Sequence, residues 1–204
     1  MLEYGNLSTR WKTLRCKLLG TADIDRWRDA SNFDDWGNRT RIVAGLLPAE
    51  VHIIEFGAGR RLLKGYLAPG SRYVASDIVD RGPGTIVLDL NSRPLPNLQP
   101  LGFDVAVLAG VLEYIVDLAS FLRWLEVQVP TCVASYNCAA SRRRSLGRIR
   151  ERFRRTGFGW INTFDEDELL TLFQAAGWEA NAAVDWHTPD GSERIFRFSR
   201  TSLV

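Results

Sequence analysis

Cysteine and histidine are scarce in this sequence, and it has no long apolar run. The three cysteines, Cys16, Cys132 and Cys138, lack metal-site spacing, and their odd number argues against a disulfide framework. The longest apolar run, Val105–Leu112, is too short to span a membrane, and no secretory signal is visible. We therefore expect reduced thiols, a cytoplasmic location, no metal and no transmembrane segment.

The composition is that of a globular protein. The chain has 204 residues, of which 46% are hydrophobic and 25% charged, enough for one domain with a sizeable core. The formal net charge is +2, but the segment 141–155 holds eight arginines and one glutamate. A basic band therefore interrupts a mildly acidic chain. We expect an N-terminal arm (1–21) and a single domain (22–204) that carries an Arg-rich insertion (141–160).

From residue 51 onward, apolar strands alternate with amphipathic helices. Strands are predicted over 51–56, 72–77, 85–90, 103–109, 130–136, 178–186 and 193–199. Helices are predicted over 24–47 and 60–67, after Asp117, along the Arg-rich segment, and after a capping box at 163–166. Strands that alternate with helices predict an α/β fold with a doubly wound, mostly parallel sheet. The last two strands predict an antiparallel hairpin.

In such sheets, ligands bind beyond the carboxyl ends of the strands. Here the first strand ends in a glycine turn, Glu55-Phe-Gly57-Ala-Gly59, and the second ends in Asp77. Glycines let a backbone approach a ligand closely, and an acid at the second strand suits ribose hydroxyls. The dinucleotide fingerprint fails because Leu62 stands at its last position, and no phosphate-loop Gly-Lys-Ser/Thr occurs. An oxidoreductase with a nucleotide cofactor is therefore the less favoured alternative.

The strand ends resemble those of the class I S-adenosylmethionine-dependent methyltransferases, in the small single-domain form. The acid-x-Gly-x-Gly turn, Asp77, the pair Asp89-Leu90 and the phrase Gly110-Val-Leu-Glu113 match that family's motifs in order. Ala175-Ala-Gly-Trp178 and the terminal hairpin are similar to the family's C-terminal end. The resemblance covers about residues 36–199 and implies a Rossmann-like, seven-stranded sheet.

The resemblance also implies S-adenosylmethionine as cofactor and S-adenosylhomocysteine as product. The residues that it assigns to cofactor binding are Glu55, Gly57, Ala58, Gly59, Asp77, Ile78, Asp89, Leu90, Ala109 and Gly110. Trp36, Arg39 and Arg41 precede the first strand, where the family often has a lid. An arginine there can pair with the cofactor's carboxylate, and the alternative is a surface helix with charged residues.

Three positions depart from the family pattern. Arg61 replaces a frequent third glycine, so its side chain either narrows the pocket or points away. Tyr114 stands where many relatives carry histidine. The spacing from Asp77 to Asp89 is short, which predicts a loop in place of the usual helix between the second and third strands.

Methyl transfer needs a general base only when the acceptor must lose a proton, as a hydroxyl does. The candidates for catalytic residues are Glu113, Tyr114 and His187. Each has a structural alternative: Glu113 as a cap or cofactor contact, Tyr114 as a core residue, and His187 as a solvated turn residue. The absence of an Asp/Asn-Pro-Pro-aromatic sequence argues against base-amine methylation, and the absence of Pro-Cys argues against a covalent cytosine mechanism.

The Arg-rich segment predicts a basic amphipathic helix, with an apolar stripe at Leu146, Ile149 and Phe153. The helix could recognise a phosphate, a nucleotide-linked sugar, a nucleic acid or an anionic membrane. The alternative is a solvated helix whose apolar stripe packs on the sheet. Nucleic acid is the less favoured of these. The acceptor-binding candidates are Asn137, Arg142, Arg143 and Arg144.

We therefore predict methyl transfer to a small or carrier-linked acceptor, which can be anionic, at oxygen rather than at a base amine. The alternative is a catalytically inactive protein with this fold that binds a partner through the Arg-rich helix. The sequence predicts no oligomeric state.

Overall fold

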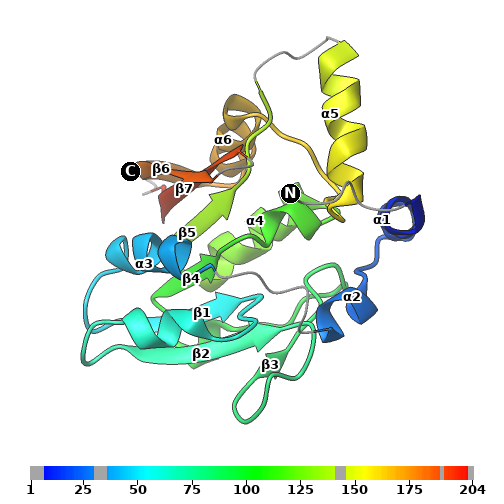
Figure 1. Ribbon diagram of the computed structural model, residues 1–204. Helices are drawn as coiled ribbons and strands as arrows, with labels where there is room; N and C mark the ends of the chain where they lie inside the picture. Colours follow the sequence, from blue (N-terminus) through cyan, green and yellow to red (C-terminus); the bar gives the residue numbers. More distant parts are fainter. Residues whose placement is uncertain (1–6, 30–35, 141–145, 189–190, 202–204) are drawn as a thin grey trace.

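The computed structural model describes residues 7–29, 36–140, 146–188 and 191–201 (Figure 1). The described part forms one seven-stranded sheet in the order β3-β2-β1-β4-β5-β7-β6. Strands β1 to β5 are parallel, and β7 runs antiparallel to both β5 and β6. The strands are β1 (His52–Phe56), β2 (Arg72–Asp77), β3 (Ile86–Val87), β4 (Val105–Leu108), β5 (Thr131–Tyr136), β6 (Trp178–Thr188) and β7 (Gly191–Arg200). The predicted doubly wound α/β fold with a C-terminal hairpin is confirmed.

Helices cover both faces of the sheet, because the central strands are apolar on both sides. The α-helices are α1 (Leu7–Leu19), α2 (Ile24–Arg28), α3 (Gly37–Gly45), α4 (Leu118–Gln128), α5 (Leu146–Gly157) and α6 (Glu166–Ala175). The short 3-10 helices are η2 (Leu62–Tyr66), η3 (Gln99–Leu101) and η4 (Leu112–Tyr114). Helices α4 and α6 pack on one face around Phe121 and Phe173, whereas α3 and η2 pack on the other around Val43 and Leu63.

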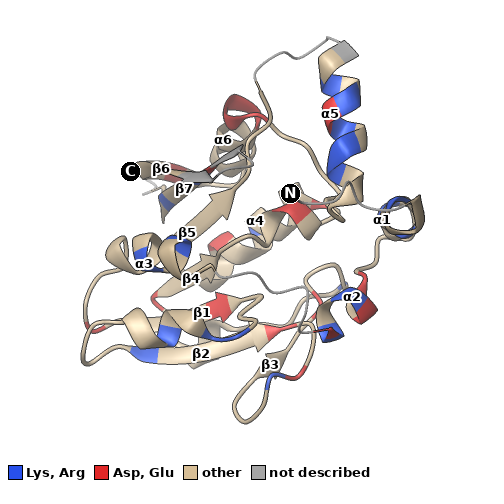
Figure 2. Cartoon of the chain, viewed as in Figure 1, with Lys and Arg blue, Asp and Glu red and all other residues tan. Residues whose placement is uncertain are grey.

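Strand order reverses between β1 and β4, so the connections that follow these two strands diverge to opposite sides. Parallel sheets bind ligands at this point, outside the carboxyl ends of the strands. Acidic residues lie at the carboxyl ends of β1 and β2, and α2 lies near the same edge of the sheet (Figures 1 and 2). The topology therefore directs the search for a site to this edge.

Several element boundaries differ from the prediction. The helix expected over 24–47 is two helices, because α2 ends where Asp29 adopts extended backbone. The expected helix over 60–67 is only η2, and the third strand shrinks to β3. The capping box begins at Asp165, not at Thr163. The Asp165 side chain accepts from Glu168 N, and the Glu168 side chain accepts from Asp165 N. Two predictions are confirmed, the cap at Asp117 and the helix-free connection between β2 and β3.

Two residues of the apolar stripe of α5 do not pack on the sheet. Helix α5 stands apart from the sheet layers (Figure 1), and Ile149 and Phe153 are exposed. At these two positions the structural alternative is wrong. The prediction that the segment is a basic helix is confirmed over 146–157.

Candidate functional site

The turn after β1 brings backbone N–H groups to the edge of the sheet. Gly57 and Gly59 have φ angles of 63° and 48°, which lie in the left-handed region that favours glycine. A Cβ atom on Gly57 would lie 2.6 Å from Val111 Cγ2, so no side chain fits there. Ala58 N donates to the Ser76 carbonyl at 3.1 Å and ties this turn to β2.

Asp77 lies at the end of β2 and is buried beside the glycine turn. Its Oδ2 accepts from Gly59 N at 2.9 Å, and its Oδ1 accepts from Val79 N at 3.1 Å and from Arg81 Nη2 at 3.2 Å. A carboxylate offers about four acceptor positions, and these three donors leave one for a ligand. Ile78, next in the chain, is half-buried at the same strand end.

Arg61 points away from the turn. Its φ of 57° lies in the left-handed region that favours glycine. The guanidinium donates to the Gly82 carbonyl at 2.8 Å, the Pro83 carbonyl at 3.2 Å and the Thr85 hydroxyl. Arg61 therefore holds the β2–β3 loop and does not narrow the turn.

Asp89 and Leu90 follow β3, and the next residue, Asn91, contacts the 3-10 helix η4. Asp89 Oδ1 accepts from Asn91 N at 2.9 Å, while Leu90 packs in the core. The Asn91 side chain donates to the Tyr114 carbonyl at 3.0 Å and accepts from Val116 N at 2.8 Å. The Asp89-Leu90 pair is thereby fixed beside η4.

A charged network lies under the end of β4. Ala109 is half-buried, and Gly110 is so close to α3 that a Cβ atom on it would lie 2.6 Å from Arg39 Nη1. That guanidinium lies 3.3 Å from Glu193 Oε1. The Ser135 hydroxyl donates to the same carboxylate and accepts from Gly110 N at 2.8 Å. Arg39 is thus buried, which corrects the surface-helix alternative at this position, whereas Arg41 is exposed.

Glu113, on η4, is a second buried acid, and its charge interacts with that of Glu193 in this network. Its Oε1 accepts from Asn137 N at 2.9 Å, but within the described part of the chain Oε2 has no hydrogen-bond partner. Burial, and then the Glu193 charge, raise the pKa of Glu113 well above its ordinary value. The side chain is 1% exposed. A buried carboxylate with one unsatisfied oxygen can receive a proton or accept a hydrogen bond from a ligand.

Arg155 holds Asn137 at two atoms. Arg155 donates to its carbonyl at 2.7 Å and to its Oδ1 at 3.2 Å, and Glu151 in turn accepts from Arg155 at 3.1 Å. The Arg155 guanidinium also lies 5.0 Å from the Trp160 ring centroid. This arginine of the Arg-rich segment therefore fixes the backbone that contacts Glu113.

Aromatic side chains surround Tyr114. The Trp27 ring meets the Tyr114 ring edge-on at 4.9 Å between centroids, and Trp160 Nε1 donates to the Tyr114 hydroxyl at 3.2 Å. Burial raises the pKa of Tyr114 to about 12, so its phenol stays protonated at neutral pH. Helix α2, which carries Trp27, is tied to the site because Arg81 donates to the Trp27 carbonyl at 2.7 Å.

Glu55 faces the opposite side of β1 from the core around Phe56. It accepts a hydrogen bond from the Tyr73 hydroxyl and is almost fully buried. Burial raises the pKa of Glu55 to about 7, despite the Tyr73 hydrogen bond and the attraction of Arg39. This carboxylate therefore contacts its neighbouring strand, not the turn that follows it.

His187 lies near the end of β6 and is paired with Ser192 of β7. Because β6 runs parallel to β5, the backbone of His187 lies at the carboxyl edge of the sheet. Arg142, Arg143 and Arg144 lie outside the described residues.

The sequence analysis missed the roles of Ser135, Glu193 and Arg155. Ser135 and Glu193 are brought together only by β5–β7 pairing, and no local spacing connects them. A single acid near the start of the apolar strand β7 was the available signal for Glu193.

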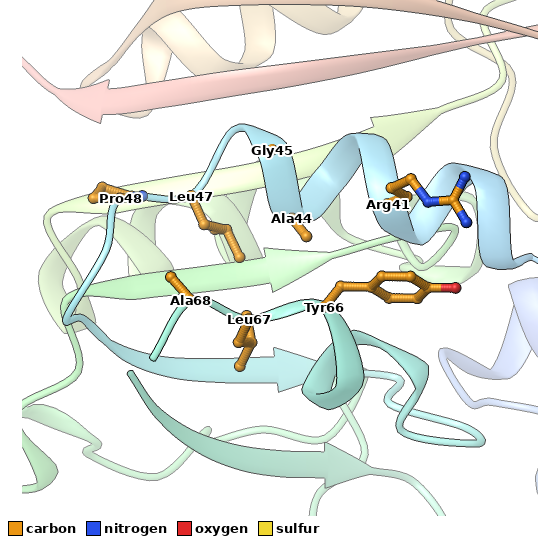
Figure 3. A pocket seen from close by; sticks show the side chains of 8 residues that line it. All are labelled: Arg41, Ala44, Gly45, Leu47, Pro48, Tyr66, Leu67 and Ala68. Carbon is orange, nitrogen blue, oxygen red and sulfur yellow. The ribbon is translucent and has the colours of Figure 1, made fainter. Parts of the chain in front are cut away.

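A pocket of about 290 Å³ lies elsewhere, between α3 and η2 (Figure 3). It is lined by Arg41, Ala44, Gly45, Leu47, Pro48, Tyr66, Leu67 and Ala68, and none of these is a predicted site residue. None of the helices in the described residues could span a membrane.

No family model and no curated protein sequence matches this chain. Solved structures do. A Burkholderia thailandensis 1,6-didemethyltoxoflavin N1-methyltransferase, with that compound and S-adenosylhomocysteine bound, is 18% identical with a TM-score of 0.63; the match covers 95% of this chain and 87% of that one. A mitomycin 7-O-methyltransferase is 16% identical, with a TM-score of 0.59 and coverage of 95% and 68%.

A magnesium protoporphyrin IX methyltransferase from Synechocystis, with S-adenosylmethionine bound, is 14% identical with a TM-score of 0.58; the match covers 96% of this chain and 99% of that one. Identities this low establish the architecture. Together with the strand order and the C-terminal antiparallel pair, they show that this chain has the Rossmann-like fold of the class I S-adenosylmethionine-dependent methyltransferases.

Proposed function

We propose that this protein is an S-adenosylmethionine-dependent methyltransferase whose small-molecule acceptor loses a proton, as a hydroxyl does. The fold supports methyl transfer, since its solved neighbours include N- and O-methyltransferases. The unpartnered oxygen of Glu113 carries the finer proposal, because it gives the site a buried group that can take that proton.

The residues at the strand ends fit the cofactor. Asp77 has acceptor capacity left for a ribose hydroxyl, and the Gly57–Gly59 turn presents backbone without side chains. Arg39 carries positive charge beside Gly110, where it suits the carboxylate of an amino acid. When bound, the cofactor supplies an electrophilic methyl group on a sulfonium.

The cofactor contacts inferred from the resemblance stay within this proposal. In this proposal Asp89 and Leu90 flank the adenine, and Ile78 contacts the cofactor beside Asp77. Ala58, Ala109 and Gly110 contribute backbone at the ends of β1 and β4. Glu55 fits less directly, since its carboxylate is engaged by Tyr73.

The protein's own contribution to catalysis is to orient the acceptor and to receive its proton. Asn137 N holds Glu113 Oε1, which leaves Oε2 as the atom that accepts the proton. Because the pKa of Glu113 is raised, it lies closer to the pKa of a hydroxyl acceptor. The carboxylate is therefore a stronger base. Tyr114, protonated at neutral pH, and Trp160 supply apolar walls and a hydroxyl for positioning.

The inactive binding protein is the second candidate. An arginine at position 61 and the lack of an obvious base in the sequence favour this candidate. The Arg61 side chain, however, binds the β2–β3 loop and leaves the glycine turn unobstructed. Arg142, Arg143 and Arg144 stay predicted contacts of a carrier-linked or anionic acceptor, and His187 stays a candidate at the hairpin.

Glu113→Gln tests the proposal. Transfer of labelled methyl from S-adenosylmethionine would be measured on a panel of phenols, carboxylic acids and heteroaromatic N–H compounds. We expect turnover of hydroxyl acceptors to fall by about 10² to 10⁴, with affinity for S-adenosylhomocysteine unchanged. Glu179→Gln, at an exposed site, is the matched control.

Equal turnover by the Glu113→Gln variant would remove Glu113 as the base. Binding of S-adenosylhomocysteine with no methylation of any acceptor in the panel would favour the inactive binding protein.

A further inference from the structure

Helix α1 is amphipathic, but its apolar face points to solvent. Leu7, Trp11, Leu14 and Leu18 follow the spacing i, i+4, i+7 and i+11, which places them on one face of the helix. Their exposed fractions run from 46% to 86%. Helices of globular proteins normally bury such a face, so this stripe lacks the usual partner within the described chain.

The polar face of α1 is the one that packs against α5. The Arg10 guanidinium lies 4.1 Å from the Phe153 ring centroid, and the Thr13 hydroxyl donates to the Thr156 carbonyl at 3.0 Å. Lys17 Nζ donates to the Ile161 carbonyl at 2.9 Å, just beyond α5. These contacts fix the orientation of α1 and turn its apolar stripe outward.

Helix α5, which lies against α1, exposes further apolar and basic side chains. Ile149 and Phe153 are 68% and 58% exposed. Arg150, Arg152 and Arg154 are also exposed, and Glu151, the one acid of α5, is bound to Arg155. Figure 2 shows basic residues along the length of α5.

The two helices concentrate positive charge. Helix α1 contributes Lys12 and Arg15 as exposed cations and contains no acidic residue. Where the helices meet, burial and then the charge of Arg152 lower the pKa of Lys17. Repulsion between like charges thus remains in the free protein, and an anionic partner would relieve it.

We propose that α1 and α5 together form a docking surface for an anionic lipid bilayer. Exposed Trp, Leu and Phe side chains beside Lys and Arg are the combination by which amphipathic helices lie in a membrane interface. Anionic headgroups complement the cations, while the acyl boundary takes up the apolar stripe.

Other occupants match the surface less well. A second copy would bring its own cations against these. A nucleic acid would satisfy the cations but would leave the leucines of α1 without an apolar partner.

The test measures co-sedimentation of the full chain with phosphatidylcholine vesicles, with and without phosphatidylglycerol. We expect binding only to the anionic vesicles, and less of it as salt rises. Trp11→Ser combined with Leu18→Ser should weaken binding at least about tenfold. Substituting Arg150, Arg152 and Arg154 by Gln should weaken it about a hundredfold.

Matched controls lie at exposed positions elsewhere. Leu101→Ser with Val127→Ser, and Arg72→Gln with Arg123→Gln, should bind as the unmodified chain does. Binding needs no methyl transfer, so this test is separate from that of the proposed function.

Three results would overturn the proposal. The first is no binding to anionic vesicles at low salt, and the second is binding that the α1 and α5 substitutions leave unchanged. The third is a dimer, seen by sedimentation velocity, that the Trp11→Ser and Leu18→Ser changes dissociate, because the surface would then serve a second copy.

Discussion

Glu55 is a buried acid whose ionisation is coupled to folding. Burial raises its pKa from 4.5 to about 7, so between these values the folded chain holds a proton that the unfolded chain releases. The stability that comes from the protonated form is complete below about pH 4.5 and is lost as pH rises through about 7. A shift of this size corresponds to about 3 kcal/mol.

Glu55→Gln should remove this dependence. The Gln carbonyl can still accept from the Tyr73 hydroxyl, and no charge has to be buried. We expect the variant to match the unmodified chain near pH 5 and to exceed its free energy of unfolding by about 2–3 kcal/mol near pH 8. Urea unfolding at both pH values measures this, with Glu179→Gln as control. Parallel pH profiles for the variant and the unmodified chain would show that Glu55 ionises normally.

At the residue scale, Arg61 shows what the sequence predicts and what it leaves open. The position was identified as a departure from a glycine pattern, and its backbone does adopt the left-handed conformation. The direction of the side chain depended on acceptors more than twenty positions away, Gly82 and Thr85, which no local pattern connects to it.

At the element scale, α5 is attached to the domain through two arginines. Arg148 pairs with Asp165 and Glu168, and Arg155 binds Asn137 and Glu151. Arg155 is 1% exposed, so its charge depends on these partners.

Arg155→Ala should therefore lower the free energy of unfolding by about 3–5 kcal/mol, because Glu151 and the Asn137 carbonyl lose their shared partner. The adjacent exposed Arg154→Ala should change it by less than about 0.5 kcal/mol. Urea unfolding of both variants measures the difference. Equal effects would mean that the contacts of Arg155 do not hold α5.

The elements themselves were largely predictable, because period-two and period-3.6 apolar patterns are local. Their ends were less so. Both Thr163-Phe-Asp-Glu166 and Asp165-Glu-Asp-Glu168 satisfy a capping box, and the chain uses the second because the helix begins at Glu166. The stripe of α5 was recognisable from its spacing, but the face against which it would lie was not.

At the scale of the whole molecule, the sheet assembles the site from distant segments. Arg39, Ser135 and Glu193 meet beneath Gly110 because β4, β5 and β7 are neighbours. The strand order could be inferred from the resemblance. The network itself could not, since it depends on side-chain packing between elements that are up to 154 positions apart in the chain.

We propose that the strand ends bind S-adenosylmethionine and its product. Asp77 is the residue through which to test it, since it binds the glycine turn and is the proposed ribose contact. Asp77→Asn keeps the size of the side chain but removes its charge, and Asp80→Asn, exposed nearby, is the control.

The most direct measurement is calorimetric titration of the chain with S-adenosylhomocysteine. We expect saturable binding to the unmodified protein and to Asp80→Asn. We expect binding to Asp77→Asn to be weaker by about 1–3 kcal/mol. Absence of binding by the folded, unmodified protein would contradict this site, as would equal affinity of the Asp77→Asn variant.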